Sequence, residues 1–583
     1  MRSFLLPQTM VGLSQSAVGA LSNWLCSSTF TCFTPRGWRL YIGDVGRSCL
    51  FALGLLGKGN SLGKGDTMTG SFERRDFFKT MGVAGVVLAG GSMLAACSPG
   101  TAKPSVEASG SLLAADIKWD EETDILVVGS GFAGLAAAIE AKTAGSEVVL
   151  IEKMPIYGGN SAINGGDMAA VGTPLQVKAG VKDDLALMEA DMLKAGKYYN
   201  HVDRVKAVAE NSAAAVEWCT SLGVEFTKLN FHGGHSVPRT NTTSNATGAD
   251  IIKAEVAKLE ELGSGVNLNT KLARLIEDEA GRIVGAEVRK NYKLGNEDSG
   301  TTAYIKANKA VVLASGGFSN DVKMRVIHEP RLTDAMTSTN HEGATGESLR
   351  EALKHGAMDV HMDWIQLGPW TSPDELGFGY TPQFCERLVG FGLMVDPETG
   401  KRFVKETGDR KERADKMLAL GRITLVLGDS VACEKQVLPR IMEGGQEAGV
   451  ILKFDTLEDI AKEFAIPQDV FLAEVARWNS FIEKKVDDDF GALIMEGATP
   501  TQTPPFYVAK LWPKVHHTMG GLVTNLQAQV INQDYEPIAG LYAAGEIAGG
   551  THGAVRLGSC AITDCVVFGR IAGQEAAKEP TQA

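Results

Sequence analysis

The sequence predicts an α/β fold with a Rossmann-like dinucleotide-binding domain. Three glycine-rich motifs lead to this prediction, and each follows an apolar, strand-like run: DILVVGSGFAG (Asp124–Gly134), AVVLASGGF (Ala310–Phe318) and GLYAAGE (Gly540–Glu546). At 583 residues, with 44% hydrophobic and 22% charged residues, the chain can build more than one globular unit.

The first motif has the order strand, glycine turn, helix. The run Ile125–Val128 precedes Gly129, Gly131 and Gly134, and the Ala-rich stretch after them predicts a closely packed helix. The strand EVVLIEK follows and reaches Glu152, where an acidic side chain can accept hydrogen bonds from a ribose. Glycines let a pyrophosphate approach the backbone N–H groups of a helix N-terminus. We therefore expect a dinucleotide site rather than an ordinary glycine turn.

Further motifs extend this site and carry a family resemblance. They are the loop KMPIYGGNSAINGG (Lys153–Gly166) and the C-terminal stretch GLYAAGEIAGGTHGAVRLGSCAITDC with Glu546. Together with the first motif, they resemble the flavoproteins of the soluble fumarate reductase and succinate dehydrogenase family, which includes urocanate and cinnamate-type enoate reductases. The resemblance covers roughly residues 120–573.

That resemblance implies a domain plan and a cofactor. The plan is a two-dinucleotide-binding-type FAD domain (116–362 and 515–583) with an inserted α+β capping domain (363–514). Membrane-bound relatives attach FAD to a histidine where this chain has Asn160 and Ser161, so we expect non-covalent FAD. The residues expected on FAD are Gly129, Gly131, Ala133, Gly134, Glu152, Lys153, Gly159, Asn160, Ser161, Gly165, Gly166, Ala314, Gly316, Gly545, Glu546, Ser559, Ala561 and Ile562.

The resemblance also selects catalytic residues. The charged segment GKRFVKETGDRKERADK (Gly400–Lys416) would by itself read as a solvated turn and helix, but its family counterpart supplies an arginine acid, here Arg410. Glu386 is the expected proton relay to it. His517 and Arg556 are expected to bind one substrate carboxylate. Since neighbouring side chains of a strand point to opposite faces, we expect only one of the two adjacent histidines in VHHTMGGL to face the pocket.

One departure from the family bears on the substrate. Fumarate reductases hold a second carboxylate with a histidine, and Gly368 stands at that position in DWIQLGPWTS. Aromatic residues such as Trp370 surround it, although they also suit an ordinary core. A glycine among aromatics predicts room for a bulky apolar group, so we expect a cinnamate-type 2-enoate.

Other functions remain open at this point. Urocanate or fumarate reduction is the next alternative, followed by a flavin-dependent ketosteroid-type dehydrogenase and by a non-enzymatic flavin carrier. We expect no metal site, and no CxxC or CxxCH spacing indicates haem or an iron–sulfur cluster. A separate cytochrome or flavoprotein, either membrane-anchored or free, must therefore supply electrons. The net charge of −13 argues against a nucleic-acid partner.

The first 115 residues read as targeting sequence. Residues 1–67 are expected to be a non-native extension or disordered, and residues 68–97 resemble a twin-arginine export signal with Arg74 and Arg75. Its apolar run is about 16 residues long, short of a membrane span. Leu94–Cys97 resembles a lipobox, which predicts a lipid anchor at Cys97, although a plain cleavage region is the alternative. Residues 98–115 read as a tether. We expect a periplasmic enzyme, or one on the extracytoplasmic face of the membrane.

Overall fold

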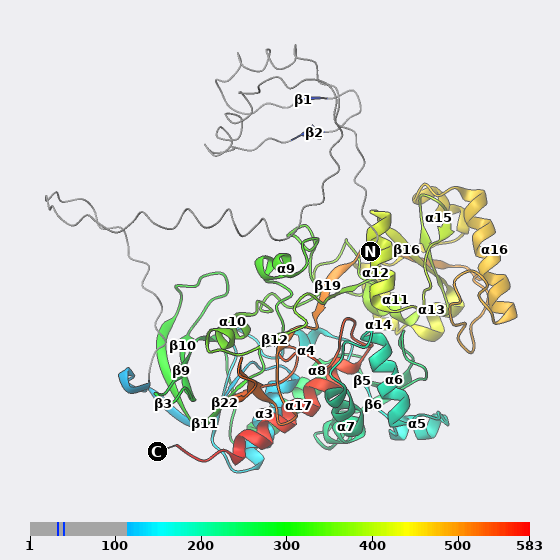
Figure 1. Cartoon of the computed structure of the whole chain (residues 1–583). Helices are drawn as coiled ribbons and strands as arrows, with labels where there is room; N and C mark the ends of the chain where they lie inside the picture. The colour runs from blue at the N-terminus through cyan, green and yellow to red at the C-terminus, as the bar shows by residue number, and fades with distance from the viewer. Residues whose placement is uncertain (1–31, 34–38, 41–113, 583) are drawn as a thin grey trace, which may run out of the picture. The chain divides into compact units, whose positions relative to one another are not determined.

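The computed structural model describes residues 32–33, 39–40 and 114–582 (Figure 1). Two short strands, β1 (Cys32–Phe33) and β2 (Arg39–Leu40), pair antiparallel within the predicted N-terminal extension. A short 3-10 helix, η2 (Ala114–Asp116), covers the end of the predicted tether. The predicted twin-arginine signal, the lipobox at Cys97 and the rest of the tether lie outside the described residues.

A central parallel sheet carries the first glycine motif. Strand β3 (Glu121–Val128) leads through the glycine turn into α3 (Phe132–Thr143), and β4 (Val148–Ile151) returns beside β3 in parallel register. Every residue from Ile125 to Val128 is buried, which explains the continuous apolar run. The predicted α/β fold with a Rossmann-like FAD domain is confirmed.

The second and third motifs follow strands of the same sheet. Strand β11 (Thr301–Leu313) pairs with β3 on one side and β22 (Pro537–Ala543) on the other, both in parallel. The carboxyl ends of these strands therefore meet at one edge. The sheet is completed by β8 (Val266–Asn267) beside β4, by β21 (Gln529–Ile531), and by the antiparallel β9 (Thr270–Glu277) and β10 (Ile283–Lys290).

The C-terminal helix α17 (Cys560–Lys578) packs along α3, as Figure 1 shows. A Cβ at Gly569 would lie 2.5 Å from the carbonyl oxygen of Ala133, and one at Gly573 would lie 2.2 Å from that of Ala137. Glycine is needed at both positions because the two helix backbones approach so closely. The contact joins the last helix of the chain to the first dinucleotide turn.

The remaining segments of this domain form helices and a second, smaller sheet. The small sheet has the order β5 (Asp167–Ala169), β7 (Thr240–Thr243), β6 (Phe226–Asn230). The helices are α4 (Gly159–Ile163), α5 (Pro174–Ala179), α6 (Leu185–Ala195), α7 (Val202–Ser221), α8 (Ala249–Glu261), α9 (Val322–His328) and α10 (Glu347–Lys354).

Residues 381–511 form a layer with its own sheet. Its strands run in the order β15 (Lys401–Arg402), β14 (Leu393–Asp396), β16 (Thr424–Asp429), β18 (Phe506–Leu511), β17 (Leu452–Phe454). Its helices are α11 (Thr381–Arg387), α12 (Arg410–Leu420), α13 (Ser430–Gln436), α14 (Pro439–Glu447), α15 (Leu457–Glu463) and α16 (Gln468–Lys484). Two apolar clusters form the core of this layer, which we call the cap.

Two short strand pairs connect the cap to the FAD domain. Strand β13 (Ile365–Gly368) pairs with β19 (Lys514–Thr518), and β12 (Asp359–Val360) pairs with β20 (Gly521–Leu522). The chain thus enters and leaves the cap along adjacent strands.

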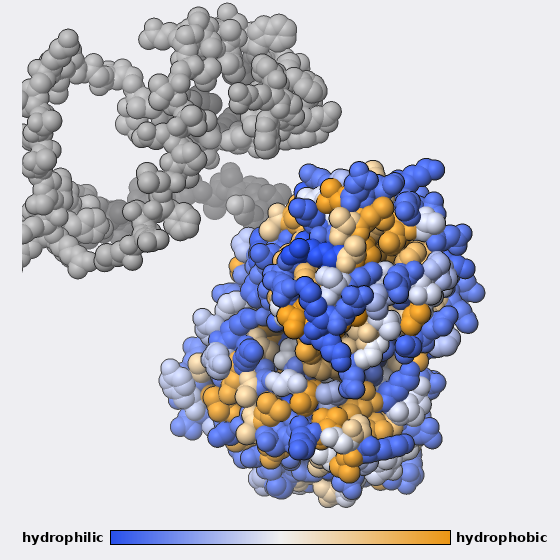
Figure 2. All heavy atoms as spheres, turned by 90° about the vertical axis from the view of Figure 1, so that its right-hand side faces the viewer, coloured by the Kyte–Doolittle hydropathy of each residue, from blue (hydrophilic) through white to orange (hydrophobic). Residues whose placement is uncertain are grey.

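The molecular surface is mixed in polarity. On the face drawn in Figure 2, hydrophobic side chains lie in small groups among hydrophilic ones. Among the helices that the structure describes, none is both long enough and apolar enough to cross a bilayer.

Candidate active site

Two adjoining cavities lie where the glycine motifs meet the cap. One, the nucleotide cavity, follows the first glycine turn; the other, the catalytic cavity, lies between that turn and the cap. Five residues line both: Phe132, Asn160, Ser161, Glu546 and Cys565. The two cavities therefore lie side by side.

The glycine turn at the start of α3 has the geometry that the sequence predicts. Gly129 has φ +105°, and a Cβ there would lie 2.5 Å from the carbonyl oxygen of Ala314. A Cβ at Gly134 would lie 1.9 Å from the oxygen of Gly129. The N–H of Phe132 donates to Ser161 Oγ (3.1 Å), which ties the second glycine loop to the helix start. The turn is tight because three backbone segments meet there.

Glu152 is held at the end of β4. Its Oε2 accepts from the N–H (3.1 Å) and the hydroxyl (2.7 Å) of Ser130, and its Oε1 accepts from the N–H of Met154 (3.0 Å). The side chain lines the nucleotide cavity. This arrangement fits an adenosine ribose at the position that the dinucleotide motif predicts.

Most of the predicted site residues line one of the two cavities. Those lining the nucleotide cavity are Gly129, Gly131, Ala133, Glu152, Lys153, Gly159, Asn160, Ser161, Ala314, Gly316, Gly545 and Glu546. Those lining the catalytic cavity include Gly165, Trp370, Glu386, Arg410, His517, Arg556, Ser559, Ala561 and Ile562.

Three predicted residues line neither cavity. Gly134 packs behind the first turn, and Gly166 packs against Thr243 and Thr247, where a Cβ would lie 2.4 Å from the Thr243 hydroxyl. Gly368 is the third. The close-packed glycines at 134 and 166 shape the FAD site from behind.

The residues present fit FAD. The pairing of a glycine turn with a ribose-binding carboxylate suits an adenine dinucleotide, and the cavity continues past α4 to the N-terminus of α17. In the second glycine loop, the Asn160 amide donates to Asn340, and its Oδ1 accepts from the N–H of His341 (2.6 Å). Gly131, Asn160, Ser161 and Ser559 line these cavities, as expected for residues that would hold FAD.

Arg410 begins α12 and enters the catalytic cavity. Asp409 caps the helix by accepting from the N–H of Glu412 (2.8 Å), which holds the first turn in place. The guanidinium carbon of Arg410 lies 5.1 Å from the centre of the Trp370 ring. Burial, with the repulsion of Arg556, lowers the pKa of Arg410 to about 9. The guanidinium is thereby a better proton donor than in water.

Glu386 lies on α11 and lines the same cavity as Arg410. Its Oε1 accepts from Arg413 Nη2 (2.8 Å), and its side chain is 11% exposed. Burial alone would raise the pKa of Glu386, but the charges of Arg413 and Arg410 lower it to about 2. The carboxylate is therefore ionised between two arginines. Sequence reasoning did not identify Arg413.

Both histidines of the VHHTMGGL motif line the catalytic cavity, so the expectation that only one would do so was wrong. Where β13 pairs with β19, Gln366 lies opposite His517 and the next residue, Leu367, lies opposite Val515. His516 has no opposite residue and forms a β-bulge. A bulge interrupts the alternation of side chains and redirects them. A single sequence carries no signal for such a bulge.

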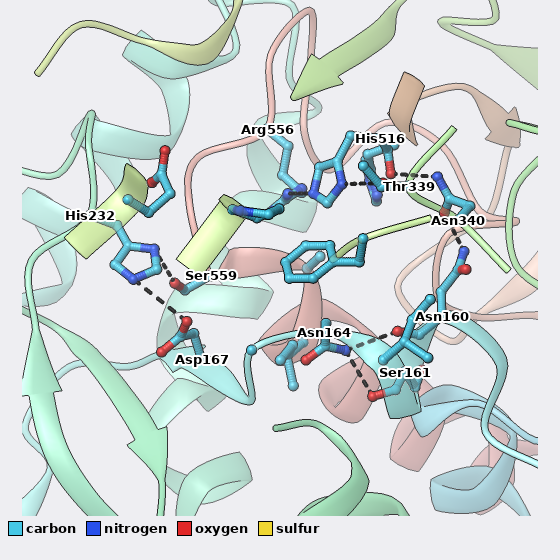
Figure 3. Close-up of a pocket in the computed structure, with 18 of the residues that line it drawn as sticks. Asn160, Ser161, Asn164, Asp167, His232, Thr339, Asn340, His516, Arg556 and Ser559 are labelled. Atoms are coloured by element: carbon cyan, nitrogen blue, oxygen red, sulfur yellow. Dashed lines mark hydrogen bonds and ion pairs between the residues drawn. The ribbon is translucent and has the colours of Figure 1, made fainter. Parts of the chain in front are cut away.

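His516 is held between Arg556 and Thr339 (Figure 3). Arg556 Nη2 donates to His516 Nε2 (3.1 Å), and an arginine cannot accept. His516 must then carry its proton on Nδ1 and donate to the Thr339 hydroxyl (2.8 Å). Burial lowers the pKa of His516 well below its usual value, so the ring is neutral.

His517 and Arg556 each have a buried nitrogen without a hydrogen-bond partner among the described residues. His517 Nδ1 lies 3.5 Å from Glu546 Oε1, whereas His517 Nε2 and Arg556 Nε are buried without a hydrogen-bond partner among the described residues. Burial, followed by the charge of Arg556, lowers the pKa of His517 well below its usual value. Unpaired buried donors and acceptors cost about 1–3 kcal/mol each, so a ligand that pairs with them gains affinity.

Gln366 links the two arginines. Its amide donates to the carbonyl oxygen of Arg556 (3.0 Å) and accepts from Arg410 Nη1 (3.4 Å). Although Gln366 lies in the segment that the sequence singled out, its role depends on β13 pairing with β19. Gln366 therefore fixes Arg410 of the cap relative to Arg556 of the FAD domain.

Gly368 does not provide the room expected from the sequence. A Cβ at Gly368 would lie 3.0 Å from the Trp370 ring, so the indole occupies the space beside the glycine. Trp370 is 2% exposed and its ring meets that of His516 edge-on at 4.7 Å. The side chain two residues along the chain therefore fills the space beside Gly368 in this structure.

A second polar cluster faces the catalytic cavity. His232 Nδ1 lies 3.1 Å from the Ser559 hydroxyl, and Nε2 lies 3.6 Å from Asp167 Oδ2. Figure 3 shows this cluster on the other side of the cavity from His516. Burial lowers the pKa of His232. Sequence reasoning missed both residues: His232 belongs to no motif, and Asp167 comes directly after the second glycine loop.

Comparisons with known proteins agree with this geometry. Residues 124–562 match the model of the FAD binding domain family. The acrylate reductase flavoprotein subunit of Shewanella woodyi is 39% identical over 511 residues, which cover 86% of this chain and 97% of that protein. The urocanate reductase of Eggerthella lenta is 35% identical over 474 residues, covering 78% and 75%.

A solved structure is also similar. The open conformation of a flavocytochrome c3 fumarate reductase superposes with a TM-score of 0.64 at 34% identity. It covers 79% of this chain and 79% of that one. The likeness includes both the FAD domain and the segment that carries the cap.

Proposed function

Since the chain belongs to the family of FAD-binding-domain flavoproteins that includes acrylate, fumarate and urocanate reductases, we propose that it reduces the C=C bond of a monocarboxylic 2-enoate. The observation that carries this proposal is the pair of buried, unpartnered nitrogens, His517 Nε2 and Arg556 Nε, beside Arg410 in one cavity. A carboxylate would pair with both nitrogens.

In this proposal, His517 and Arg556 bind and orient the carboxylate, and bound reduced FAD supplies the hydride for the β-carbon. The developing negative charge at the α-carbon and carboxylate is stabilised by Arg556 and Arg410. Arg410 donates the proton to the α-carbon, and burial favours this because it lowers the pKa of the guanidinium to about 9. One hydride and one proton together saturate the double bond.

Glu386 is proposed to return the proton to Arg410. Its carboxylate is ionised and interacts with the charges of Arg410 and Arg413. A base between two guanidinium groups can accept a proton from one and pass it to the other. Arg413, whose Nε and Nη1 are buried without partners among the described residues, would be the outer member of this relay.

The far end of the substrate is proposed to be uncharged and small. Trp370 fills the space beside Gly368, and the neighbouring Cys385 is fully buried. A second carboxylate buried against an indole would cost several kcal/mol. This favours an acrylate-type enoate over fumarate.

An aromatic 2-enoate is the second candidate. The half-buried Phe378 lines both the catalytic cavity and a neighbouring cavity that opens beside Tyr380 and Arg440. A longer apolar group could extend past Phe378 into that space. The steroid alternative has less support, because steroid chemistry on this fold relies on tyrosines and none lines the catalytic cavity in the described part of the chain.

We further propose that the enzyme acts outside the cytoplasm with a separate electron donor. The relative from Shewanella woodyi is named a flavoprotein subunit, which favours a cytochrome or flavoprotein partner. The twin-arginine segment at Arg74 and Arg75 supports export, and Cys97 supports a lipid anchor.

A substrate panel tests the function. Purified protein is mixed anaerobically with reduced viologen and with acrylate, crotonate, cinnamate, urocanate or fumarate, and viologen oxidation is followed. We expect the highest kcat/KM with acrylate and far lower values with fumarate. No turnover with any enoate would refute the proposal. Dye reduction that depends on a ketosteroid would establish the dehydrogenase alternative.

A further inference from the structure

A buried arginine lies behind the carboxylate-binding pair. Arg204 is on the first turn of α7 and is 1% exposed. Its guanidinium carbon lies 3.8 Å from the centre of the Phe568 ring on α17. Burial lowers the pKa of Arg204, and the carboxylate of Asp564 opposes that change. A buried charge is costly unless it is paired, so its partners indicate what it does.

Most partners of Arg204 belong to the loop that carries Arg556 and to the helix after it. A further partner is the Thr524 hydroxyl, to which Arg204 Nη1 donates. Arg204 Nε donates to the Thr551 hydroxyl (2.9 Å), and Nη2 lies 3.9 Å from Asp564 Oδ1. The Thr551 hydroxyl in turn donates to Asp564 Oδ1 (2.9 Å). We call residues 549–557 the arginine loop. Arg204 thus connects α7, the arginine loop and α17.

The chain just before Arg204 holds the same loop through its backbone. The Asn200 amide donates to the carbonyl oxygen of Thr551 (2.9 Å), and the N–H of His201 donates to that of Gly550 (2.8 Å). A Cβ at Gly550 would lie 2.7 Å from the His201 ring. This close contact allows the arginine loop little freedom to shift outward.

The network continues to the second member of the carboxylate-binding pair. His552, in the arginine loop, has Nε2 3.8 Å from Asp564 Oδ2, and its ring meets that of His517 edge-on with 5.5 Å between centroids. His517 is therefore linked to this buried network through His552, and Arg556 is linked to it through the arginine loop. The positive charge of the network is on Arg204.

We infer that Arg204 is a positioning residue that sets the separation of His517 and Arg556 through Thr551, Asp564 and His552. The inference rests on the proposed function, in which this pair binds the substrate carboxylate. Without Arg204, the arginine loop loses its side-chain anchor and Asp564 loses its countercharge. Misplacement of a binding group by about 1 Å can cost up to about a hundredfold in rate.

A matched control is available on α17. Arg570 of α17 also stacks on an aromatic ring, with its guanidinium carbon 5.3 Å from the centre of the Trp218 ring. It pairs with Glu140 on α3 (2.6 Å), so its partners lie on helices rather than on the arginine loop. Replacing Arg570 removes an arginine–aromatic contact and an ion pair without touching the carboxylate-binding pair.

The experiment compares Arg204→Met with Arg570→Met in the FAD-loaded protein. FAD content, thermal midpoint, KM, kcat and the Kd of propionate, read from the flavin absorbance, are measured for each. We expect Arg204→Met to keep FAD but to raise KM and Kd about tenfold or more, with partial recovery on adding guanidinium ion. Arg570→Met should stay within about twofold of wild type. Unchanged KM and Kd in Arg204→Met, or equal losses in both variants, would overturn the inference.

A milder variant covers the case in which Arg204→Met does not fold. Thr551→Val removes one hydroxyl, and with it the hydrogen bonds to Arg204 and Asp564, and should raise the Kd of propionate about threefold or more. An unchanged Kd there would equally contradict the positioning role. Because propionate binding requires no turnover, loss of the reductase proposal and loss of this inference are distinguishable.

Discussion

Arg556 donates a hydrogen bond from Nη2 to His516 Nε2 across 3.1 Å, which assigns the tautomer of a histidine that the sequence places next to His517. We expect His516→Ala to raise KM for the enoate about tenfold. Without the imidazole, the Arg556 guanidinium is no longer held in the orientation that binds the substrate carboxylate. Steady-state kinetics measure this change. Thr339→Val removes only the other partner of the ring and should have a smaller effect; equal effects would argue against a specific role of His516.

Arg410 is expected to be essential for the chemical step. Arg410→Lys should lower kcat by at least about a hundredfold while FAD remains bound, because proton transfer by a positioned group contributes about 10²- to 10⁴-fold. The control is Arg422→Lys, a partly exposed arginine of the cap that pairs with Asp396. Turnover at the wild-type rate in Arg410→Lys would exclude it as the proton donor.

Trp370 is expected to determine substrate size. Trp370→Ala removes the indole that lies against Gly368, so kcat/KM for cinnamate relative to acrylate should rise at least about tenfold. Gly368→Ala, which presses a methyl group onto the same ring, should lower activity toward both. A wild-type ratio in Trp370→Ala would place the size limit elsewhere.

Carboxylate binding should weaken as pH rises. Burial lowers the pKa of His517 in the free protein, and a bound carboxylate raises it again. A ligand that raises a pKa binds more tightly when the group is protonated, so the Kd of propionate should increase as pH rises from the pKa of the free protein to that of the complex, by up to about tenfold per pH unit, and should level off above it. Flavin absorbance titrations between about pH 5.5 and 8.5 measure it.

A histidine variant is needed as a control, because burial also raises the pKa of Asp564 to about 6. His517→Gln should remove the part of the slope that belongs to the histidine. If the pH dependence is the same in His517→Gln and in wild type, the histidine does not bind the carboxylate as a cation.

Glu255 on α8 is expected to make folding stability depend on pH. Both of its carboxylate oxygens are buried without a hydrogen-bond partner among the described residues, and burial raises its pKa well above the usual value. The folded chain then binds a proton that the unfolded chain releases above about pH 4.3. Stability contributed by the neutral acid is lost as pH rises toward the folded pKa.

Glu255→Gln should therefore raise the thermal midpoint at pH 8 by roughly 2 °C or more, the change expected for about 1 kcal/mol. The gain should shrink as pH falls and vanish below about pH 4, where both states of the wild type are protonated. Glu140→Gln, which breaks a pair with Arg570, should bring no gain. Differential scanning calorimetry distinguishes these outcomes.

The sequence alone determined the dinucleotide site and the cofactor class. Gly129, Gly134 and Glu152 lie within one strand–turn–helix–strand unit, so local propensity and spacing are sufficient to predict their arrangement. The family resemblance selected Arg410, and the structure places it on the first turn of α12, directly after its capping residue Asp409. These features depend on neighbours close along the chain.

Only the tertiary structure decided the fine shape of the active site. A bulge in β19 turns His516 toward Arg556, the indole of Trp370 closes the space at Gly368, and Arg204 reaches Thr551, 347 residues away. Each of these depends on strand register or on side chains that meet from distant segments. Hydrophobic patterning predicts which face is buried, but it does not encode which buried polar groups meet there.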